Sequence, residues 1–219
     1  MSKTEELSPR LMTVVSLIPS CKSVVDVGSD HGKLGVWCLQ NNRCEQVVAT
    51  DIHTLPAERT KEKLREAGLE ERSEVHVADG LCGVALQSDM TVVIAGMGGL
   101  EIIKILKAAH ESSGIPAGLS FVLQPQRSHY ELRSYLSGHG WEIRDEKIAL
   151  ERGHFYTVMY VCYTGRAYSM TDKELFLGPV ILKKKPEHYD AFMAHEKNVM
   201  AKRAIGDPRC AEILKNWKV

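Results

Sequence analysis

A repeated alternation of short apolar runs with amphipathic segments constrains the fold of this chain more than any other feature. The apolar runs have the length of strands, and the apolar residues of the amphipathic segments have the spacing of a helix. The five runs are residues 24–27, 46–50, 74–77, 91–95 and 120–123. A strand that is apolar throughout is typical of a parallel sheet, because helices cover both faces of such a sheet. The sequence therefore predicts a parallel sheet built from five strand–helix units.

The pattern changes after residue 140. Residues 141–150 and 155–163 have the pattern of two long strands joined tightly at Arg152-Gly153, which predicts an antiparallel hairpin. Together these runs predict an α/β fold with a seven-stranded, mostly parallel sheet that ends in an antiparallel hairpin. A helix from about Ser8 to Ile18 is expected before the first strand, because Pro19 stops the helical spacing.

The last part of the chain has a different character. Residues 165–180 contain two glycines and a proline and are expected to form a linker, and helical spacing returns over 186–205 and 209–217. We therefore expect two domains: a sheet domain over residues 1–164, and a linker with a small helical C-terminal extension over residues 165–219.

The composition excludes several classes of protein. The chain has 219 residues, of which 44% are hydrophobic, so it can bury a core and is not wholly disordered. No apolar run approaches the roughly 20 residues that span a bilayer, and the polar N-terminus lacks a secretory signal. The six cysteines form no C-x-x-C pair, so we expect reduced thiols, no metal site and a cytoplasmic location.

The charge is segregated although the formal net charge is zero. Residues 180–219 carry nine basic and five acidic side chains, which gives this segment a charge of +4 and leaves the rest of the chain at −4. Such segregation indicates a basic appendage on an acidic body.

The turns after the strands contain an unusual number of Gly and Asp residues. In an open parallel sheet, ligands bind at the carboxyl ends of the strands, where the strand order reverses. The first turn has the pattern Asp26-x-Gly28-x-Asp30-x-Gly32, whereas a dinucleotide-binding turn needs G-x-G-x-x-G to hold a diphosphate. Asp30 stands where the second glycine belongs, and its carboxylate would repel a phosphate. The turn suits S-adenosylmethionine, which carries a sulfonium and an amino group but no phosphate.

Two further acids follow the second and third strands. Asp51 stands where a carboxylate accepts the hydroxyl protons of a ribose, and Asp79 stands where the amino group of an adenine needs an acceptor. Each acid alone is more often a turn or cap residue, but the three acids occur in the order that a bound nucleoside requires.

Three motifs together make the sequence resemble a known family. Residues 25–32 (VDVGSDHG), 93–99 (VIAGMGG) and 123–125 (LQP) resemble the bacterial TrmK family, and the resemblance extends over roughly residues 7–163. Members of this family are S-adenosylmethionine-dependent tRNA adenine-N1 methyltransferases that act at tRNA position 22. The resemblance implies a class I methyltransferase, Rossmann-like fold, with S-adenosylmethionine as cofactor and tRNA as partner.

The resemblance also implies roles for individual residues. Asp30 is expected to face the charge that develops on the base, His31 to orient Asp30 or contact the base, and Gln124 to pair with a base edge. The expected cofactor-binding residues are Asp26, Gly28, Ser29, Asp51, Ile52, Asp79, Gly80, Ala95, Gly96, Met97 and Gly98. The basic residues expected to bind RNA are Lys183, Lys184, Lys185, Lys202 and Arg203.

The chain departs from the family pattern at three places. Lys33 stands where the family has an aromatic residue, Gln126 where it has Asn, and Tyr156-Thr157 where it has an aromatic–Glu pair. These departures concern substrate contacts more than cofactor binding.

Other functions remain open at this point. The same kind of sheet serves nicotinamide-dependent oxidoreductases, although Asp30 and the terminal hairpin disfavour that class. A methyltransferase of another RNA, a small molecule or a protein fits the neutral overall charge. A module that binds a cofactor or RNA without turnover is a further alternative.

Overall fold

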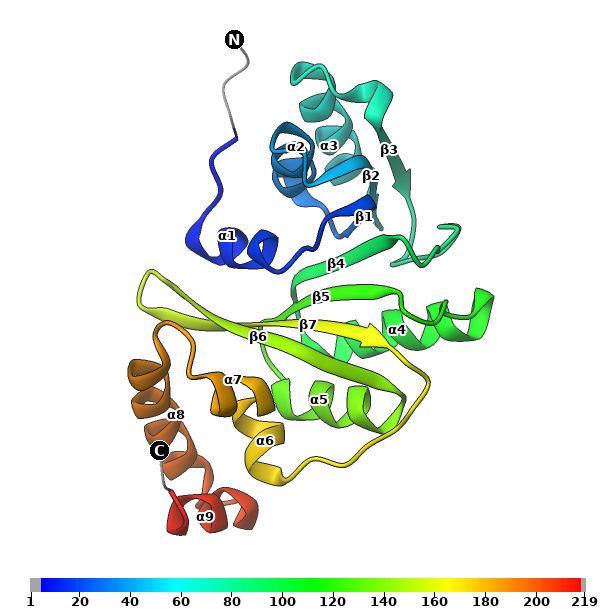
Figure 1. The fold of residues 1–219 in the computed structure, drawn as a ribbon. Helices are drawn as coiled ribbons and strands as arrows, with labels where there is room; N and C mark the ends of the chain where they lie inside the picture. The colour runs from blue at the N-terminus through cyan, green and yellow to red at the C-terminus, as the bar shows by residue number, and fades with distance from the viewer. Residues whose placement is uncertain (1–4, 218–219) are drawn as a thin grey trace.

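A seven-stranded sheet forms the centre of the molecule in a computed structural model, which describes residues 5–217 apart from the side chains of Asp30 and Ser113. The strands lie in the order β3-β2-β1-β4-β5-β7-β6 (Figure 1). Their bounds are β1 Cys21–Val27, β2 Cys44–Asp51, β3 Ser73–Val77, β4 Met90–Met97, β5 Ser120–Pro125, β6 Trp141–Glu151 and β7 His154–Tyr163.

The direction of the strands agrees with the sequence pattern. Strands β1 to β5 are parallel, while β7 is antiparallel to both β5 and β6. The predicted mostly parallel sheet with its terminal hairpin is confirmed. Because β1 lies between β2 and β4, the strand order reverses beside β1, and this places a ligand-binding crevice at the carboxyl end of β1.

Helices cover both faces of the sheet. Helices α1 (Pro9–Ser16), α2 (Lys33–Gln40) and α3 (Thr54–Glu66) contribute to one apolar core, and α4 (Gly99–Ser113) and α5 (His129–Gly138) contribute to the other. Successive side chains of β1 point to opposite faces of the sheet, so Val24 packs in the first core and Val25 in the second. Two short 3-10 helices, η1 (Asp30–Gly32) and η2 (Glu70–Arg72), complete this part of the fold.

The third strand–helix unit departs from the prediction. Residues 78–89, which connect β3 to β4, form no helix, so the interpretation of five strand–helix units was wrong at this place. The connection turns at Gly80 and Gly83, both of which have positive φ angles that glycine adopts without strain. Leu81 anchors the loop in the core, and the Thr50 hydroxyl donates a hydrogen bond to the Gly80 carbonyl (2.8 Å).

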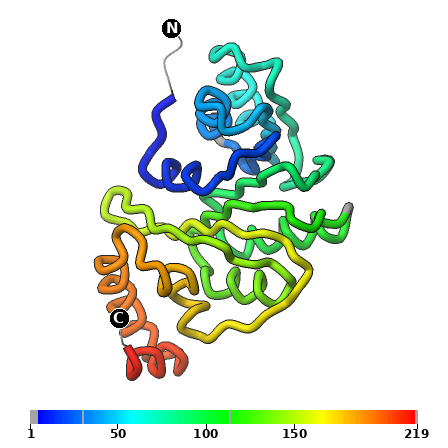
Figure 2. Tube along the Cα trace, viewed as in Figure 1, coloured from blue at the N-terminus to red at the C-terminus, as the bar shows by residue number. Residues whose placement is uncertain are grey.

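The segment predicted as a linker contains two helices. These are α6 (Asp172–Leu177) and α7 (Pro179–Lys184), and they precede α8 (Tyr189–Arg203) and α9 (Pro208–Lys215). The linker prediction for residues 165–180 was therefore wrong in its second half, because Thr171 and Glu174 form a capping box that starts α6. Pro179 occupies the first turn of α7, where proline needs no amide donor, rather than interrupting structure. Figure 2 shows the chain passing from β7 down the side of the molecule to these helices.

A third apolar cluster joins the C-terminal helices to the sheet domain. Leu177, Ile181 and Phe192 pack with Ile148 of β6, so the cluster reaches onto the hairpin. A buried ion pair strengthens the same junction: the Nε atom of Arg133 in α5 lies 2.9 Å from Oε1 of Glu146 in β6. The extension therefore packs firmly on the sheet domain, and a domain boundary between residues 164 and 165 stays a prediction.

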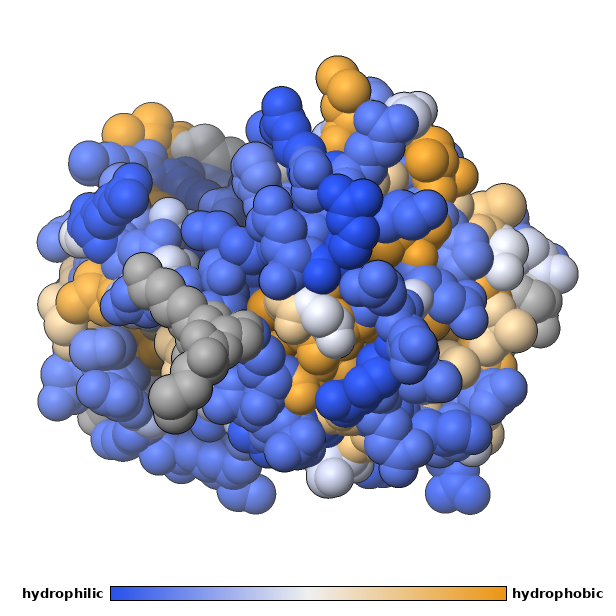
Figure 3. All heavy atoms as spheres, turned by 90° about the horizontal axis from the view of Figure 1, so that it is seen from above, coloured by the Kyte–Doolittle hydropathy of each residue, from blue (hydrophilic) through white to orange (hydrophobic). Residues whose placement is uncertain are grey.

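The face of the molecule that is seen from above is mostly hydrophilic (Figure 3). Figure 3 shows hydrophobic residues gathered in a recess near the middle of the face seen from above. None of the helices in the described part of the chain has the length and apolar character needed to cross a bilayer. Among the described residues no group of His, Cys, Asp and Glu has an arrangement that could hold a metal ion, and all six cysteines are free.

Candidate cofactor and substrate site

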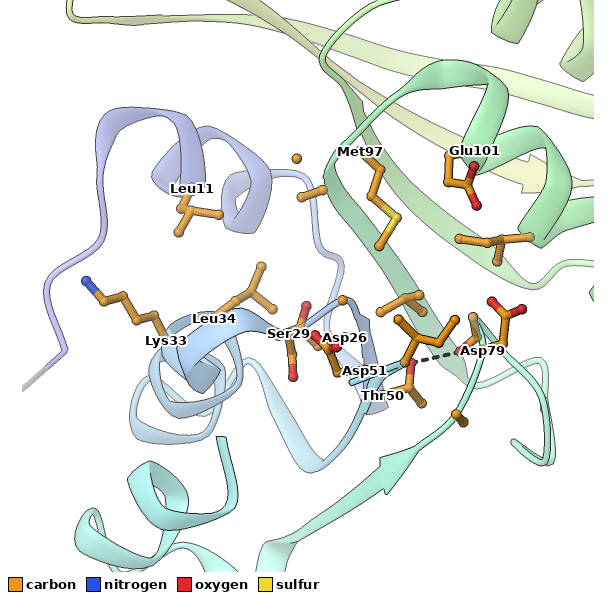
Figure 4. Close-up of a pocket in the computed structure, with 18 of the residues that line it drawn as sticks. Leu11, Asp26, Ser29, Lys33, Leu34, Thr50, Asp51, Asp79, Met97 and Glu101 are labelled. Carbon is orange, nitrogen blue, oxygen red and sulfur yellow. Dashed lines mark hydrogen bonds between the residues drawn. The ribbon is translucent and has the colours of Figure 1, made fainter. Parts of the chain in front are cut away.

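A cleft of about 570 Å³ lies at the carboxyl ends of the first four strands (Figure 4). Its walls come from the turns after β1, β2 and β4, the loop after β3, and the first turns of α1, α2 and α4. The residues that line it are Arg10, Leu11, Asp26, Val27, Gly28, Ser29, Lys33, Leu34, Thr50, Asp51, Ile52, Ala78, Asp79, Gly80, Ala95, Gly96, Met97, Glu101 and Ile105. The cleft is therefore the crevice that the reversal in strand order predicts.

The cleft brings together nearly all residues that the sequence predicted to bind a cofactor. Ten of the eleven line it, and the exception is Gly98, which lies just beyond at the N-cap of α4. Strand ends that are far apart in the sequence meet here because parallel strands share one carboxyl edge. Their roles in binding stay predictions.

The turn after β1 is built differently from a diphosphate-binding turn. Gly28 has a φ angle of 72°, which a glycine adopts without strain. The amides of Gly28 and Ser29 both donate to the carbonyl of Thr50, at 2.8 and 3.2 Å. Since these amides already have an acceptor inside the protein, the turn does not offer them to a phosphate group.

Three carboxylates face the cleft from three successive strand ends. Asp26 and Asp51 are nearly buried, and Asp79 is exposed. Oδ1 of Asp51 accepts a hydrogen bond from the amide of His53 (2.9 Å), which holds the carboxylate at the end of β2. Lys33 also lines the cleft, but Figure 4 shows its side chain directed away from these carboxylates. The part of the cleft between the carboxylates therefore favours cationic groups and hydrogen-bond donors.

The buried carboxyl of Asp26 binds its proton unusually tightly. Burial, with a smaller contribution from the neighbouring Asp51 carboxylate, raises the pKa of Asp26 from 3.8 to about 7. A cation placed in the cleft would favour the ionised form of Asp26. The electrostatics of the free cleft therefore suit a positively charged ligand.

We expect the raised pKa of Asp26 to make the stability of the free protein depend on pH. Because the folded state holds this proton more tightly than the unfolded state, the stabilising contribution is full below about pH 4. It is lost as the pH rises through about 7. Asp26→Asn removes this dependence, so urea unfolding should show a smaller fall in stability between pH 4 and pH 8 for the variant. Coinciding pH profiles for the two proteins would contradict this expectation.

Arg10 is a cleft residue that the sequence reading missed. Its Nη1 donates to Oε1 of Gln124 (2.7 Å), and its guanidinium lies 5.8 Å from the centre of the Tyr156 ring. Oε1 of Gln124 also accepts from the amide of Gly96 (3.1 Å), so one side chain fixes both Arg10 and the turn after β4. No local pattern could have revealed this contact, because 114 residues separate Arg10 from Gln124 in the sequence.

The three residues predicted to be catalytic have different outcomes. Gln124 is fully buried, and its Nε2 donates to the carbonyl of Pro125 (2.9 Å), so its side chain is engaged within the protein and does not face the cleft. In this arrangement Gln124 does not present its side chain for the predicted contact with a base edge. His31 is exposed with a φ angle of 65° and does not line the cleft. The side chain of Asp30 lies outside the described residues, so its predicted role is not tested.

The residues predicted to bind RNA are not equivalent. The Nζ of Lys184 lies 2.8 Å from Oδ1 of Asp145, and the Nζ of Lys185 lies 5.4 Å from the centre of the Tyr189 ring. Lys183 and Lys202 are exposed. Arg203 differs from the lysines because it lines a second cavity between α8 and the sheet domain.

Comparison with known proteins gives consistent matches over most of the chain. Residues 24–207 match the TrmK family, described as tRNA (adenine(22)-N(1))-methyltransferase. The chain is 29% identical to the tRNA (adenine(22)-N(1))-methyltransferase of Bacillus subtilis over 187 residues, which cover 82% of this chain and 76% of that protein.

Solved structures resemble nearly the whole length of the chain. The crystal structure of the B. subtilis m1A22 tRNA methyltransferase TrmK is 26% identical, with a TM-score of 0.76 over 97% of this chain and 94% of that one. The structure of M. capricolum TrmK in complex with S-adenosyl-homocysteine also has a TM-score of 0.76, at 22% identity over 96% of this chain and 94% of that one. This second likeness shows a shared fold.

Proposed function

The chain belongs to the TrmK family of tRNA (adenine(22)-N(1))-methyltransferases, and we propose that it transfers the methyl group of S-adenosylmethionine to N1 of adenine 22 in tRNA. The observation that carries this proposal is the family match over residues 24–207. The sheet order and the structural neighbours confirm the class I methyltransferase, Rossmann-like fold.

The cleft has the chemistry that S-adenosylmethionine needs. Asp51 is proposed to accept the ribose hydroxyl protons, Asp79 to accept from the adenine amino group, and Asp26 to face the amino group of the methionine part. The engaged amides of the turn after β1 argue against a nicotinamide dinucleotide in the same place. These observations favour a methyltransferase over an oxidoreductase.

The transfer needs positioning more than a protein nucleophile. N1 of adenine has a lone pair in the plane of the ring. This lone pair can attack the methyl group that S-adenosylmethionine carries on its sulfur. As the N1–C bond forms and the S–C bond breaks, the positive charge passes from the sulfur to the base. Gly96 lines the cleft without a side chain, so a flat base can come close there.

Two of the predicted catalytic residues receive different proposals. Asp30 stays the candidate to face the developing charge on the base, since its backbone follows the Gly28 turn. Gln124 is proposed to act as a positioning residue, because it holds both Arg10 and the amide of Gly96 at the edge of the cleft.

The target base must be accessible on its Watson–Crick edge. N1 lies on that edge, so an adenine in a base pair cannot react, and the nucleotide must be unpaired or withdrawn from its stack. The relatives are named as tRNA methyltransferases, which supports tRNA as the substrate of this chain. A cytoplasmic location stays a prediction.

A methyl-transfer assay tests the proposed function. The protein is incubated with methyl-labelled S-adenosylmethionine and bulk tRNA, and the RNA is then digested to nucleosides. We expect the label in N1-methyladenosine. Label in another nucleoside would support a different RNA methyltransferase, and a protein that binds S-adenosylmethionine but leaves tRNA unlabelled would contradict the proposal.

A further inference from the structure

A second cavity of about 640 Å³ lies between the sheet domain and the C-terminal helices. The loop between β5 and α5 forms one wall, the start of β7 a second, and α5, α6, α8 and α9 the others. The lining residues used below are Arg127, Thr157, Phe155, Glu196, Arg203 and Arg209. Because β7 is antiparallel to β5, its first residues lie at the carboxyl end of β5, and the cavity opens at the same edge of the sheet as the cofactor cleft.

The two cavities are neighbours separated by a pair of hydrogen-bonded loops. The amide of Gln126 donates to the carbonyl of Met97 (2.8 Å), and the amide of Gly99 donates to the carbonyl of Arg127 (2.9 Å). The side chain of Arg127 lies against Gly98, since a Cβ atom built on that glycine would be 3.2 Å from Nε of Arg127. A chain of nucleotides that places one base in the cofactor cleft therefore has its next segment close to the second cavity.

Arg127 and Arg203 line the second cavity together with Glu131 and Glu196. The side chains of Arg127 and Arg203 form no hydrogen bond or ion pair with the residues that the structure describes. Asp207 is already bound by Arg209, with an Nη2–Oδ2 distance of 2.7 Å. Burial raises the pKa of Glu196, and the nearby charges of Arg203 and Arg133 act in the opposite direction. Two arginines are therefore available for an anionic ligand.

The second cavity also offers contacts for a nucleobase. The guanidinium of Arg209 lies 4.5 Å from the centre of the Tyr130 ring, and nucleobases stack readily on such guanidinium planes and on aromatic rings. Phe155 adds a half-buried ring to the lining. Two buried lining atoms, Oγ1 of Thr157 and Nη2 of Arg133, have no hydrogen-bond partner in the described part of the chain. Each of these two atoms still has the capacity for a hydrogen bond to a bound molecule.

We propose that the second cavity binds a nucleotide of the tRNA that flanks the methylated adenosine, with its phosphate at Arg127 and Arg203 and its base beside Thr157. This inference rests on the proposed function and adds a second RNA subsite to it. Thr157 belongs to one of the places where the chain departs from the family pattern, so this subsite is a feature of the chain's own residues.

Charge reversal at the two free arginines tests the phosphate contact. We expect Arg127→Glu combined with Arg203→Glu to raise the KM for tRNA at least about tenfold, while kcat and the Kd for S-adenosylmethionine stay within about twofold. The slope of log affinity against log salt should fall by about 1.4, because each phosphate contact on a single strand contributes about 0.7. Lys22→Glu combined with Lys61→Glu is the matched control, because both lysines are exposed. Lys22 lies at the amino end of β1, away from the carboxyl ends of the strands, and Lys61 lies on α3.

A second variant tests the base contact without changing charge. Thr157→Val keeps the shape of the side chain and removes the unpartnered hydroxyl. We expect the melting temperature to stay the same or rise, and the KM for tRNA to rise about fivefold. An unchanged KM for tRNA would contradict the base contact, and a lower melting temperature would assign Thr157 a structural role.

The outcomes separate this inference from the proposed function. A wild-type protein that does not methylate tRNA contradicts the proposed function. A wild-type protein that methylates tRNA, together with arginine variants that match the lysine control in KM and salt slope, contradicts the second subsite alone. Loss of kcat with an unchanged KM for tRNA would also contradict the second subsite.

Discussion

Asp51→Ala is expected to lower the affinity for S-adenosylmethionine about 100-fold or more. Asp51 is the nearly buried carboxylate at the end of β2, and we propose that it accepts both ribose hydroxyl protons. A hydrogen bond to a charged group contributes roughly 1.5–3 kcal/mol, so the loss of two such bonds accounts for an effect of this size. Isothermal titration calorimetry of the free protein with S-adenosylmethionine measures the change directly.

The fold should survive the removal of Asp51. Its Oδ1 accepts only the amide of His53 among the described hydrogen bonds, and removing its charge also relieves the repulsion that raises the pKa of Asp26. Asp89→Ala provides a control with the same change in net charge, because Asp89 is exposed in the loop before β4, away from the cleft. Equal affinities for Asp51→Ala and the wild type would remove Asp51 from the binding site.

Glu146→Ala is expected to destabilise the protein by about 3–5 kcal/mol, because it leaves the buried charge of Arg133 without a counterion. Both side chains are at most 1% exposed. Oε2 of Glu146 also accepts from the amides of Val180 (2.9 Å) and Ile181 (3.3 Å), and Nη1 of Arg133 donates to the carbonyl of Leu175 (3.0 Å). The pair therefore connects α5 and β6 with the C-terminal helices.

Thermal unfolding measures this loss as a lower melting temperature, on the order of 10 °C for a chain of this size. The double variant Arg133→Met with Glu146→Leu removes both charges and should be more stable than Glu146→Ala. It should stay below the wild type, because the amides of Val180 and Ile181 lose their acceptor. If Glu146→Ala unfolds at the same temperature as the wild type, the pair does not hold the extension on the sheet domain.

The strand ends that form the cleft were predictable from sequence. Asp26, Asp51 and Asp79 each follow a buried apolar run, and parallel topology alone brings such residues to one edge. Their order along the chain then indicated which part of the ligand each carboxylate faces. Regular alternation made this inference possible without any knowledge of long-range contacts.

The rest of the site depends on contacts that no local pattern contains. Arg10 lies at the cleft because Gln124 holds its side chain there, and the two residues are 114 positions apart in the sequence. The hydrogen bonds of Gln124 inside the protein were equally unpredictable, because the motif that contains it is typical of a turn that faces a ligand. The second cavity has walls from β7 and from α8, and α8 is placed by the apolar cluster around Ile148.

Two errors in the predicted elements have local causes. Gly178 and Pro179 predict a linker, but in the structure they separate two short helices. Glu146 accepts hydrogen bonds from the first amides of α7. The regular alternation around β3 predicts a strand–helix unit there as well. Its own residues, with turns at Gly80 and Gly83, form a loop.

Methylation of matched tRNA transcripts tests the central claim most directly. One transcript carries adenosine at position 22 and the other carries guanosine there, and both are incubated with the wild-type protein and methyl-labelled S-adenosylmethionine. The proposed function predicts about one methyl group per molecule in the first transcript, recovered as N1-methyladenosine, and none in the second. Equal labelling of the two transcripts would contradict it.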